Sequence, residues 1–301
     1  MSPRARVWRA GALSAVFALT AACGSAAGST SGAASAAPAA GGQPSQLVGL
    51  WSTVGPTVPP GTVLKLTADR QLFVFSDCGA PFGFWRAVPS GAMNAVLMVA
   101  APDCPAEAGD DEWERSTPTW LRSVSAFRST GSKRVLLDDA GRTVAELSRT
   151  DTAPGAAIAG ERVPPDPPTA QDVAHLDAST PAPAGLRAAV PADLTGRWIP
   201  TPAMSGGKVF VEFAPNRSVH LFDGCNWSRG RFTMGAGGAF ASVLYLSYVL
   251  ACANAPVADW LQNAAWASFE GADLVLTDAS GVRLGGLRRV ADAPTASPSA
   301  G

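Results

Sequence analysis

The chain has little charge, few histidines and almost no long apolar stretch. Only 16 % of its 301 residues are charged, against about 25 % in an average globular protein. The 23 basic and 24 acidic residues leave a net charge of −1, so the chain lacks the basic excess of a nucleic-acid-binding protein. Hydrophobic residues make up 47 %, which is enough for a core and excludes a wholly disordered chain. The length allows about two domains.

The one apolar run of notable length lies at the N-terminus. Three arginines within residues 1–9 precede an uncharged stretch from Ala10 to Ala22. These two features are typical of the basic and apolar regions of a secretory signal. The run is too short for a membrane-spanning helix, which needs roughly 20 residues. We therefore predict a signal peptide over residues 1–22 and an exported protein.

Cys23 follows the apolar run directly, after the small residues Thr20, Ala21 and Ala22. This arrangement resembles the lipobox of bacterial lipoproteins, although that family usually has leucine where Thr20 stands. The resemblance implies that Cys23 carries palmitate-like acyl chains and holds the protein on the extracytoplasmic face of the cell membrane. Ordinary signal-peptidase cleavage near Ala22 is the alternative. Residues 23–46, rich in Gly, Ala and Ser, are expected to form a flexible tether.

An internal repeat is the most informative feature of the sequence. Leu47–Trp51 recurs as Leu194–Trp198 at an offset of 147 residues, and Trp120-Leu121 recurs as Trp260-Leu261 at an offset of 140, after an insertion in the first copy. Ordered matches over such a length predict two copies of one structural unit. The predicted organisation is a first domain over 47–150, a Pro/Ala-rich linker over 151–193, a second domain over 194–290 and a disordered tail over 291–301.

Local patterns within each copy favour strands over helices. Apolar residues alternate over Val209–Phe213, a turn follows at 214–217, and Ser218–Asp223 continues as a second strand. Prolines at 118 and 256 each precede a segment with apolar residues on one helical face. The predicted fold class is mainly β, with two tandem small antiparallel β-sheet or barrel-like domains, each carrying one helix.

Four cysteines lie within the two predicted domains and allow three pairings. Only Cys78–Cys104 together with Cys225–Cys252 respects the repeat and keeps each bond inside one domain. Export favours oxidation, so we predict these two disulfides. Metal binding is the alternative, but the sequence has no Cys-x-x-Cys pair and no histidine near these cysteines, and we expect no metal.

The second copy is similar to a META domain, a family that includes heat-inducible lipoproteins of bacterial envelopes. The resemblance rests on these residues: Leu194-Thr-Gly-Arg-Trp198, Gly224-Cys225-Asn226, Ser247, Ala251-Cys252, Trp260-Leu261 and Leu274-Val-Leu276. It implies a small β-rich fold with a disulfide between Cys225 and Cys252. The first copy is a diverged relative, with Asp77-Cys78-Gly79 in place of the Gly-Cys-Asn signature. The resemblance implies architecture and location rather than a reaction.

The sequence offers little material for catalysis. There are two histidines, His175 in the linker and His220 on a predicted strand, and neither is placed as a general base by any recognisable motif. Serine-hydrolase, phosphate-loop and zinc-protease motifs are absent. The acidic run over 110–114 lacks the ligand spacing of a calcium loop. We therefore expect no catalytic residue, no cofactor and no enzymatic activity, with a hydrolase of unrecognised site as the alternative.

A candidate binding face follows the second Gly-Cys-Asn signature. Trp227, Arg229 and Arg231 come after Asn226 at a spacing of two, which places all three side chains on one side of a strand. An indole beside two guanidinium groups can stack on a sugar or hold an anion; an outward face in which arginine stems cover Trp227 is the alternative. Together these features predict a lipid-anchored, envelope-associated or stress-related binding module with an unidentified ligand or partner protein, or alternatively a structural surface spacer.

Overall fold

The computed structural model describes residues 41–77, 79–99, 112–154, 165–204, 208–246 and 255–290. All of them belong to one compact unit, Pro38–Gly301. The predicted signal peptide, the lipidation residue Cys23, and Cys78, Cys104 and Cys252 lie outside the described residues. Among the described residues, no helix combines the length and apolar character that crossing a membrane requires.

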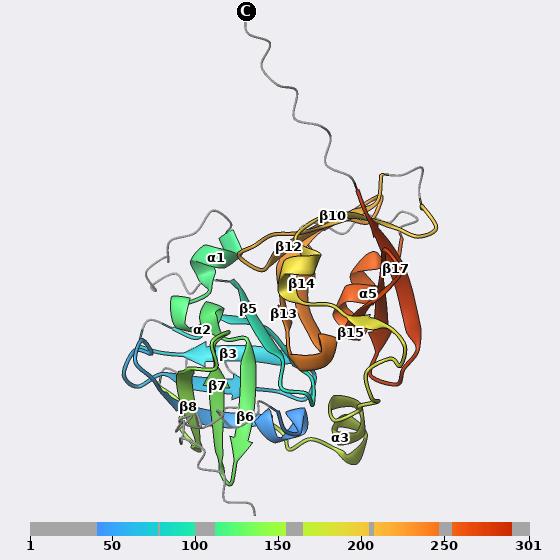
Figure 1. Cartoon of the computed structure of the whole chain (residues 1–301). Coiled ribbons are helices and arrows are strands. Elements are labelled where there is room, and N and C mark those ends of the chain that lie inside the picture. Colours follow the sequence, from blue (N-terminus) through green and yellow to red (C-terminus); the bar gives the residue numbers. More distant parts are fainter. Residues whose placement is uncertain are drawn as a thin grey trace, which may run out of the picture. The chain divides into compact units, whose positions relative to one another are not determined.

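Two antiparallel sheets dominate the fold (Figure 1), which confirms the predicted mainly β architecture. One sheet is nearly closed and barrel-like, and the other is a curled half-barrel. The first has the order β5-β4-β3-β2-β1-β8-β7-β6. Its strands are β1 (Gly49–Val54), β2 (Val63–Leu66), β3 (Gln71–Phe75), β4 (Phe82–Ala87), β5 (Met93–Val99), β6 (Ala126–Thr130), β7 (Lys133–Leu137) and β8 (Thr143–Arg149).

The second sheet repeats this order strand for strand as β14-β13-β12-β11-β10-β17-β16-β15, and β9 is added at its edge. Its strands are β9 (Arg187–Ala188), β10 (Gly196–Pro200), β11 (Phe210–Phe213), β12 (Ser218–Phe222), β13 (Trp227–Met234), β14 (Phe240–Leu246), β15 (Ala264–Glu270), β16 (Asp273–Asp278) and β17 (Arg283–Arg289). The duplication visible in the sequence is therefore also a duplication of topology.

The repeated tryptophans occupy identical positions in the two cores. Trp51 and Trp198 are each 1 % exposed. The indole Nε1 of Trp51 donates a hydrogen bond to Leu47 O at 2.7 Å, and that of Trp198 donates to Leu194 O at 2.7 Å. A guanidinium group covers each ring, because the first strand of each copy pairs with the last strand, which supplies an arginine. In both domains the leucine and the tryptophan of the Leu-x-Gly-x-Trp segment are thus joined by a hydrogen bond from the indole to the leucine carbonyl.

Short helices pack against each sheet. In the first copy α2 (Thr119–Ser123) buries Trp120 and Leu121, and in the second α5 (Val257–Asn263) buries Trp260 and Leu261. Both lie where the proline signals predict a helix. The first copy also contains α1 (Glu112–Ser116), at the end of its insertion. A 3-10 helix, η4 (Ala236–Gly238), connects β13 to β14.

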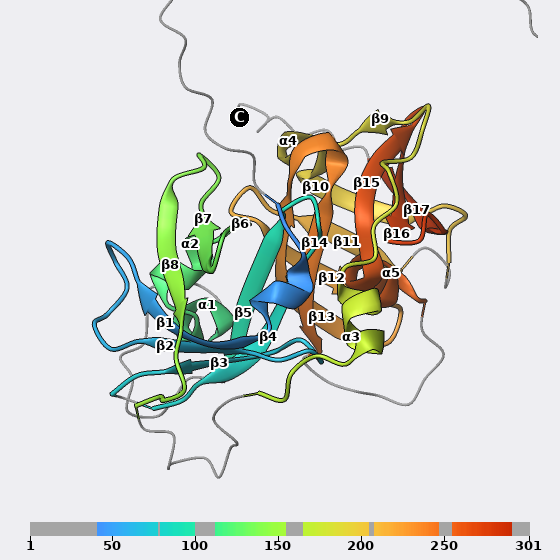
Figure 2. The ribbon, with the colours of Figure 1, turned by 90° about the horizontal axis from the view of Figure 1, so that it is seen from below.

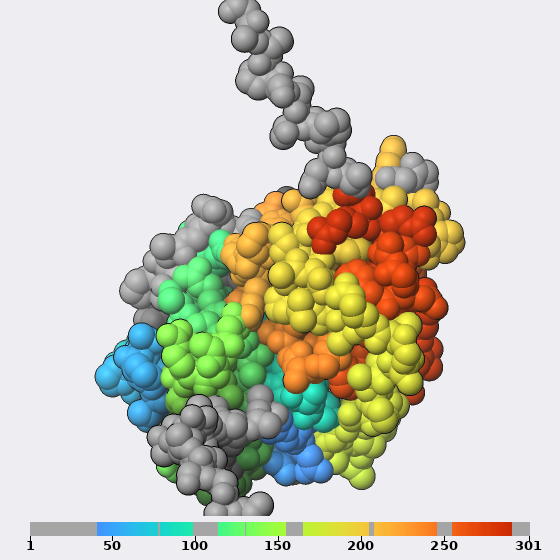
Figure 3. Space-filling model, viewed as in Figure 1, coloured from blue at the N-terminus to red at the C-terminus, as the bar shows by residue number. Residues whose placement is uncertain are grey.

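The linker contains more regular structure than its composition suggests. Helix α3 (Ala170–Leu176) begins with a capping box at Thr169, and Leu176 enters the core of the first domain. Asp177 accepts hydrogen bonds from the backbone N and the hydroxyl of Ser45, in η1 (Pro44–Leu47). Further along, β9 pairs with β15 and is followed by α4 (Pro191–Leu194). The linker therefore packs on the first domain at one end and on the second at the other (Figure 2), and its yellow-green residues form part of the molecular surface (Figure 3).

The two domains keep separate cores but contact each other through strands β4–β5 and β13–β14. Val88 and Ala92 pack with Ala239 and Ala265, and Val96 packs with Val243. Polar bonds accompany these apolar contacts: Asn94 Nδ2 donates to Arg231 O at 2.5 Å, and Thr233 Oγ1 donates to Ser125 O at 3.1 Å. The outward faces of these strands are thus buried against each other.

Candidate functional site

A cleft of about 450 Å³ lies where the first domain meets the second. Its walls are largely apolar, and two arginines enter from the first domain. Arg70 lies on the turn between β2 and β3, and Arg86 on β4, whereas Tyr245 comes from β14. The lining residues are Asp69, Arg70, Phe84, Trp85, Arg86, Met98, Ser242, Val243, Leu244, Tyr245 and Gln262. An apolar cleft with a few convergent polar groups is the usual form of a ligand site.

Arg86 is the most unusual residue of the cleft. It is only 5 % exposed, and its Nη1 donates to Leu261 O at 3.3 Å, while its Nε has no hydrogen-bond partner within the described ranges. No ion pair joins it to a carboxylate in the described part of the chain. Burial and, second, the charge of Arg70 lower the pKa of Arg86 to about 9. At neutral pH it is therefore a buried cation without a carboxylate partner among the described residues, a costly arrangement unless an anion enters the cleft.

Arg70 places a second cation beside Arg86 and connects the cleft to α3. Its Nη2 lies 3.0 Å from His175 Nε2. Because an arginine nitrogen can only donate, Nε2 accepts this hydrogen bond and His175 is neutral. Burial, followed by the charges of Arg70 and Arg86, lowers the pKa of His175, which agrees with the neutral form. The two guanidinium groups thus act on the histidine as well as on each other.

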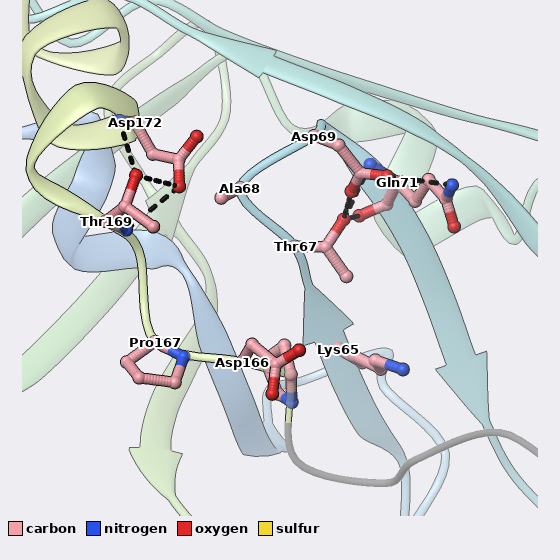
Figure 4. Close-up of a pocket in the computed structure, with 10 residues that line it drawn as sticks. Lys65, Thr67, Ala68, Asp69, Gln71, Asp166, Pro167, Thr169 and Asp172 are labelled. Atoms are coloured by element: carbon pink, nitrogen blue, oxygen red, sulfur yellow. Dashed lines mark hydrogen bonds between the residues drawn. The ribbon is translucent and has the colours of Figure 1, made fainter.

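A second hollow, of about 420 Å³, lies between the β2–β3 turn and the linker (Figure 4). Its lining is polar, but two of its carboxylates, Asp69 and Asp172, are engaged locally. Asp69 accepts hydrogen bonds from Thr67 and Gln71, and Asp172 accepts from Thr169. The described residues contain no group of three His, Cys, Asp or Glu side chains that could hold a metal ion. The cleft at Arg86 is therefore the better candidate site.

The binding face predicted on β13 is only partly open. Alternation does place Trp227, Arg229 and Arg231 on one side of the strand, as expected, and Trp227 is 46 % exposed. Arg231, however, is 6 % exposed and donates to the carbonyl oxygen of Arg122 in the first domain. The first domain therefore covers the Arg231 end of the candidate face, and ligand binding at this face stays a prediction.

Asn226 is also buried rather than displayed. It is 5 % exposed and lies in a turn, where its backbone N donates to Asp223 Oδ1 at 2.6 Å. The neighbouring Cys225 donates its backbone N to the same carboxylate at 2.8 Å. Cys225 is disulfide-bonded. Cys78, Cys104 and Cys252 lie outside the described residues, so the proposed pairing stays a prediction.

No sequence pattern singles out Arg70, Arg86 and Tyr245. They come from three separate segments, and the counterpart of Arg86 in the second copy is Thr233, so the repeat does not single it out. The capping box from Thr169 to Asp172 is a signal that could have predicted α3, and with it an ordered position for His175.

Comparisons of the chain with protein-family models, with curated proteins and with solved structures found no match, so the resemblance to META domains stays a prediction.

Proposed function

We propose that the protein is an exported, lipid-anchored binding module of the cell envelope, built from two META-like domains, and that the cleft at Arg86 receives an anionic ligand with an apolar body. The single observation that carries the ligand site is the buried guanidinium of Arg86, which has no carboxylate partner among the described residues. The lipobox-like segment ending at Cys23 supports the anchor.

The chemistry of the cleft favours a carboxylate-type ligand. A planar guanidinium presents donors that match the two oxygens of a carboxylate, and such charge-assisted bonds are stronger than neutral ones. Arg70 supplies a second positive charge at the same wall. Phe84, Met98 and Tyr245 line the remaining surface and can bury an apolar body. The ligand would therefore combine a charged head with an aromatic or aliphatic tail.

The arrangement supports binding over hydrolysis. The hydroxyl of Ser242 donates to Leu261 O at 2.8 Å, and His175 contacts Arg70. The Ser242 hydroxyl is thus bonded to a backbone carbonyl and not to a general base, which is the partner that an activated serine nucleophile requires. A hydrolase remains the alternative and would release product from an ester or amide analogue of the ligand.

Benzoate and octanoate are suitable probes, with benzamide as the neutral control. We expect the two carboxylates to bind the protein in isothermal titration calorimetry and benzamide to bind much more weakly. Arg86→Met should weaken carboxylate binding about tenfold or more, since a hydrogen bond to a charged group contributes roughly 1.5–3 kcal/mol. Arg231→Met removes another buried arginine outside the cleft and should leave the affinity unchanged. Equal binding of benzoate and benzamide, or full affinity in Arg86→Met, would contradict the proposal.

Arg86→Met should also stabilise the ligand-free protein. The substitution keeps an apolar stem and removes an uncompensated buried charge, a change that can add about 1–3 kcal/mol to the free energy of unfolding. Leu261 O loses one donor but still accepts from Ser242. Because the lowered pKa of Arg86 is about 9, the gain should be constant from pH 6 to pH 8 and shrink above pH 9. Urea denaturation of both proteins measures it.

Arg231→Met is the matched control for this gain. Arg231 is buried to the same degree, and burial and the charge of Arg217 lower its pKa to about 10. Unlike Arg86, it has carboxylates nearby, since the charges of Asp139 and Glu114 partly oppose this lowering. Removing it should destabilise the protein. If both substitutions changed stability in the same direction, Arg86 would be no less compensated than Arg231, and the ligand site would lose its main support.

A further inference from the structure

We propose that the segment following Val290, which begins Ala291-Asp292-Ala293-Pro294, docks on the outer face of the second sheet over Phe210, Phe222 and Trp227. We call these three residues the aromatic face. The proposal concerns a different surface from the cleft and does not depend on the proposed function.

The aromatic face is a row of rings across three neighbouring strands. Phe210 of β11 pairs in register with Phe222 of β12, which pairs with Trp227 of β13. Ring centroids lie 5.1 Å apart for Phe222 and Trp227 and 5.6 Å apart for Phe210 and Trp227. Trp227 is 46 % exposed. The Arg197 guanidinium lies over the Phe210 ring at 4.1 Å, which leaves Trp227 as the exposed end of the row. Three adjacent aromatic side chains on a sheet face form a surface that favours an apolar cover.

The first domain shows how its copy of this face is covered. The positions equivalent to Phe210, Phe222 and Trp227, at an offset of 147, are Val63, Phe75 and Ala80. Val63 and Phe75 are 6 % and 0 % exposed and form a cluster with Leu50 and Phe73, against which Ala80 and Ala153 pack. Ala153 lies four residues beyond the end of β8. The chain that leaves the last strand of the first domain thus supplies the cover.

The chain leaves the last strand of the second domain with the same hydrogen bond as in the first domain. Thr150 N donates to Leu50 O at 3.2 Å, and the equivalent Val290 N donates to Arg197 O at 2.8 Å. Three residues later the first copy has Ala153-Pro154, and the second has Ala293-Pro294 at the offset of 140 that relates the two last strands. The same dipeptide therefore follows the same exit bond in both copies.

The geometry of the segment suits the surface. Three extended residues reach about 10 Å, which spans two strand intervals of roughly 4.8 Å, so Ala293 can reach the aromatic row from Val290. Alanine and proline make compact apolar contacts, and proline-containing segments bind aromatic-lined surfaces in an extended conformation. Trp227 replaces Ala80 and Phe210 replaces Val63, whereas Arg197 and His220 replace Leu50 and Phe73. The apolar part of the second face is therefore concentrated at the three rings.

Hydroxyl-radical footprinting with mass spectrometry tests the proposal directly. The full chain is compared with a variant that stops after Val290, and the oxidation rates of Trp227, Phe222 and Phe210 are measured. We expect a severalfold faster oxidation of Trp227 in the shortened protein. Phe82, 37 % exposed in the first domain, should be oxidised at the same rate in both proteins and serves as the internal control.

A point variant separates docking from mere chain length. Ala293→Asp places a charge at the predicted contact and should raise the oxidation of Trp227 as truncation does, whereas Ala300→Asp should not. Unchanged far-UV circular dichroism establishes that both variants are folded. Equal oxidation of Trp227 in the full and shortened chains overturns the proposal. If the oxidation rate of Trp227 instead depends on protein concentration and not on the tail, a second copy of the chain covers the aromatic face and the proposal is likewise overturned.

Discussion

Gly83→Ala and Gly230→Ala should each destabilise the protein by about 3 kcal/mol or more, the upper range for an overpacked site. The two glycines are equivalent positions of the repeat, on β4 and β13. A Cβ added to Gly83 would lie 1.9 Å from Val96 O, and one added to Gly230 would lie 1.9 Å from Val243 O. The obstructing atoms belong to the backbone of the neighbouring strand. Relief therefore requires separating β4 from β5, or β13 from β14.

The same strands form the contact between the domains, so the damage should extend beyond one sheet. Gly61→Ala is the matched control, because a Cβ added there meets nothing within 4 Å and only its φ of +78° is unfavourable, at a cost of about 1–2 kcal/mol. Urea denaturation followed by circular dichroism compares the three variants. A loss no larger than that of Gly61→Ala would mean that the strand pairs separate easily at these positions.

The sequence was sufficient for the fold because its strongest signals are local and occur twice. Residues 209–213 alternate and 214–217 form a turn, and the first copy has the same pattern, so β2–β3 and β11–β12 were predictable as hairpins. Pro118 and Pro256 similarly predicted where α2 and α5 begin. Each of these features depends on contacts within a few residues or within one hairpin.

The cleft could not be predicted because it depends on how two folded sheets pack. Arg86 occupies a position on β4 where an outward polar residue is ordinary. Nothing in its sequence neighbourhood indicates that Leu261 of the other domain will contact it, or that Val243 and Tyr245 will line the same cleft. Arg231 was interpreted as exposed for the same reason. Periodicity identifies the face on which a side chain lies, but burial of that face is decided by a partner surface far away in the sequence.

In the linker, packing produces regular structure that the amino-acid composition does not predict. Prolines at 165, 167 and 168 indicate an extended segment, yet the residues directly after them form α3. This helix buries Leu176 in the core of the first domain. A helix of this length is marginal alone, so its stability comes from that contact and from the bonds between Ser45 and Asp177. Composition therefore underestimated the order of a segment that folds only on its neighbours.

Trp198→Ala should lower the free energy of unfolding by about 3–5 kcal/mol, as expected for removing a fully buried tryptophan. The substitution leaves a cavity in the second core and removes the donor to Leu194 O, which lies at 2.7 Å. It also removes the ring that Arg289 covers at 4.7 Å. Trp198→Phe should lose less, because it keeps a ring in the core and gives up mainly the hydrogen bond.

Trp51→Ala should cost the same within experimental error, because its indole makes an identical 2.7 Å bond to Leu47 O beneath Arg149. Trp227→Ala, at a half-exposed ring, should cost much less and is the control for losing an indole. Guanidinium denaturation followed by circular dichroism measures all four variants. Markedly unequal losses for Trp51→Ala and Trp198→Ala would mean that the two domains, though alike in topology, are not stabilised in the same way by the repeated motif.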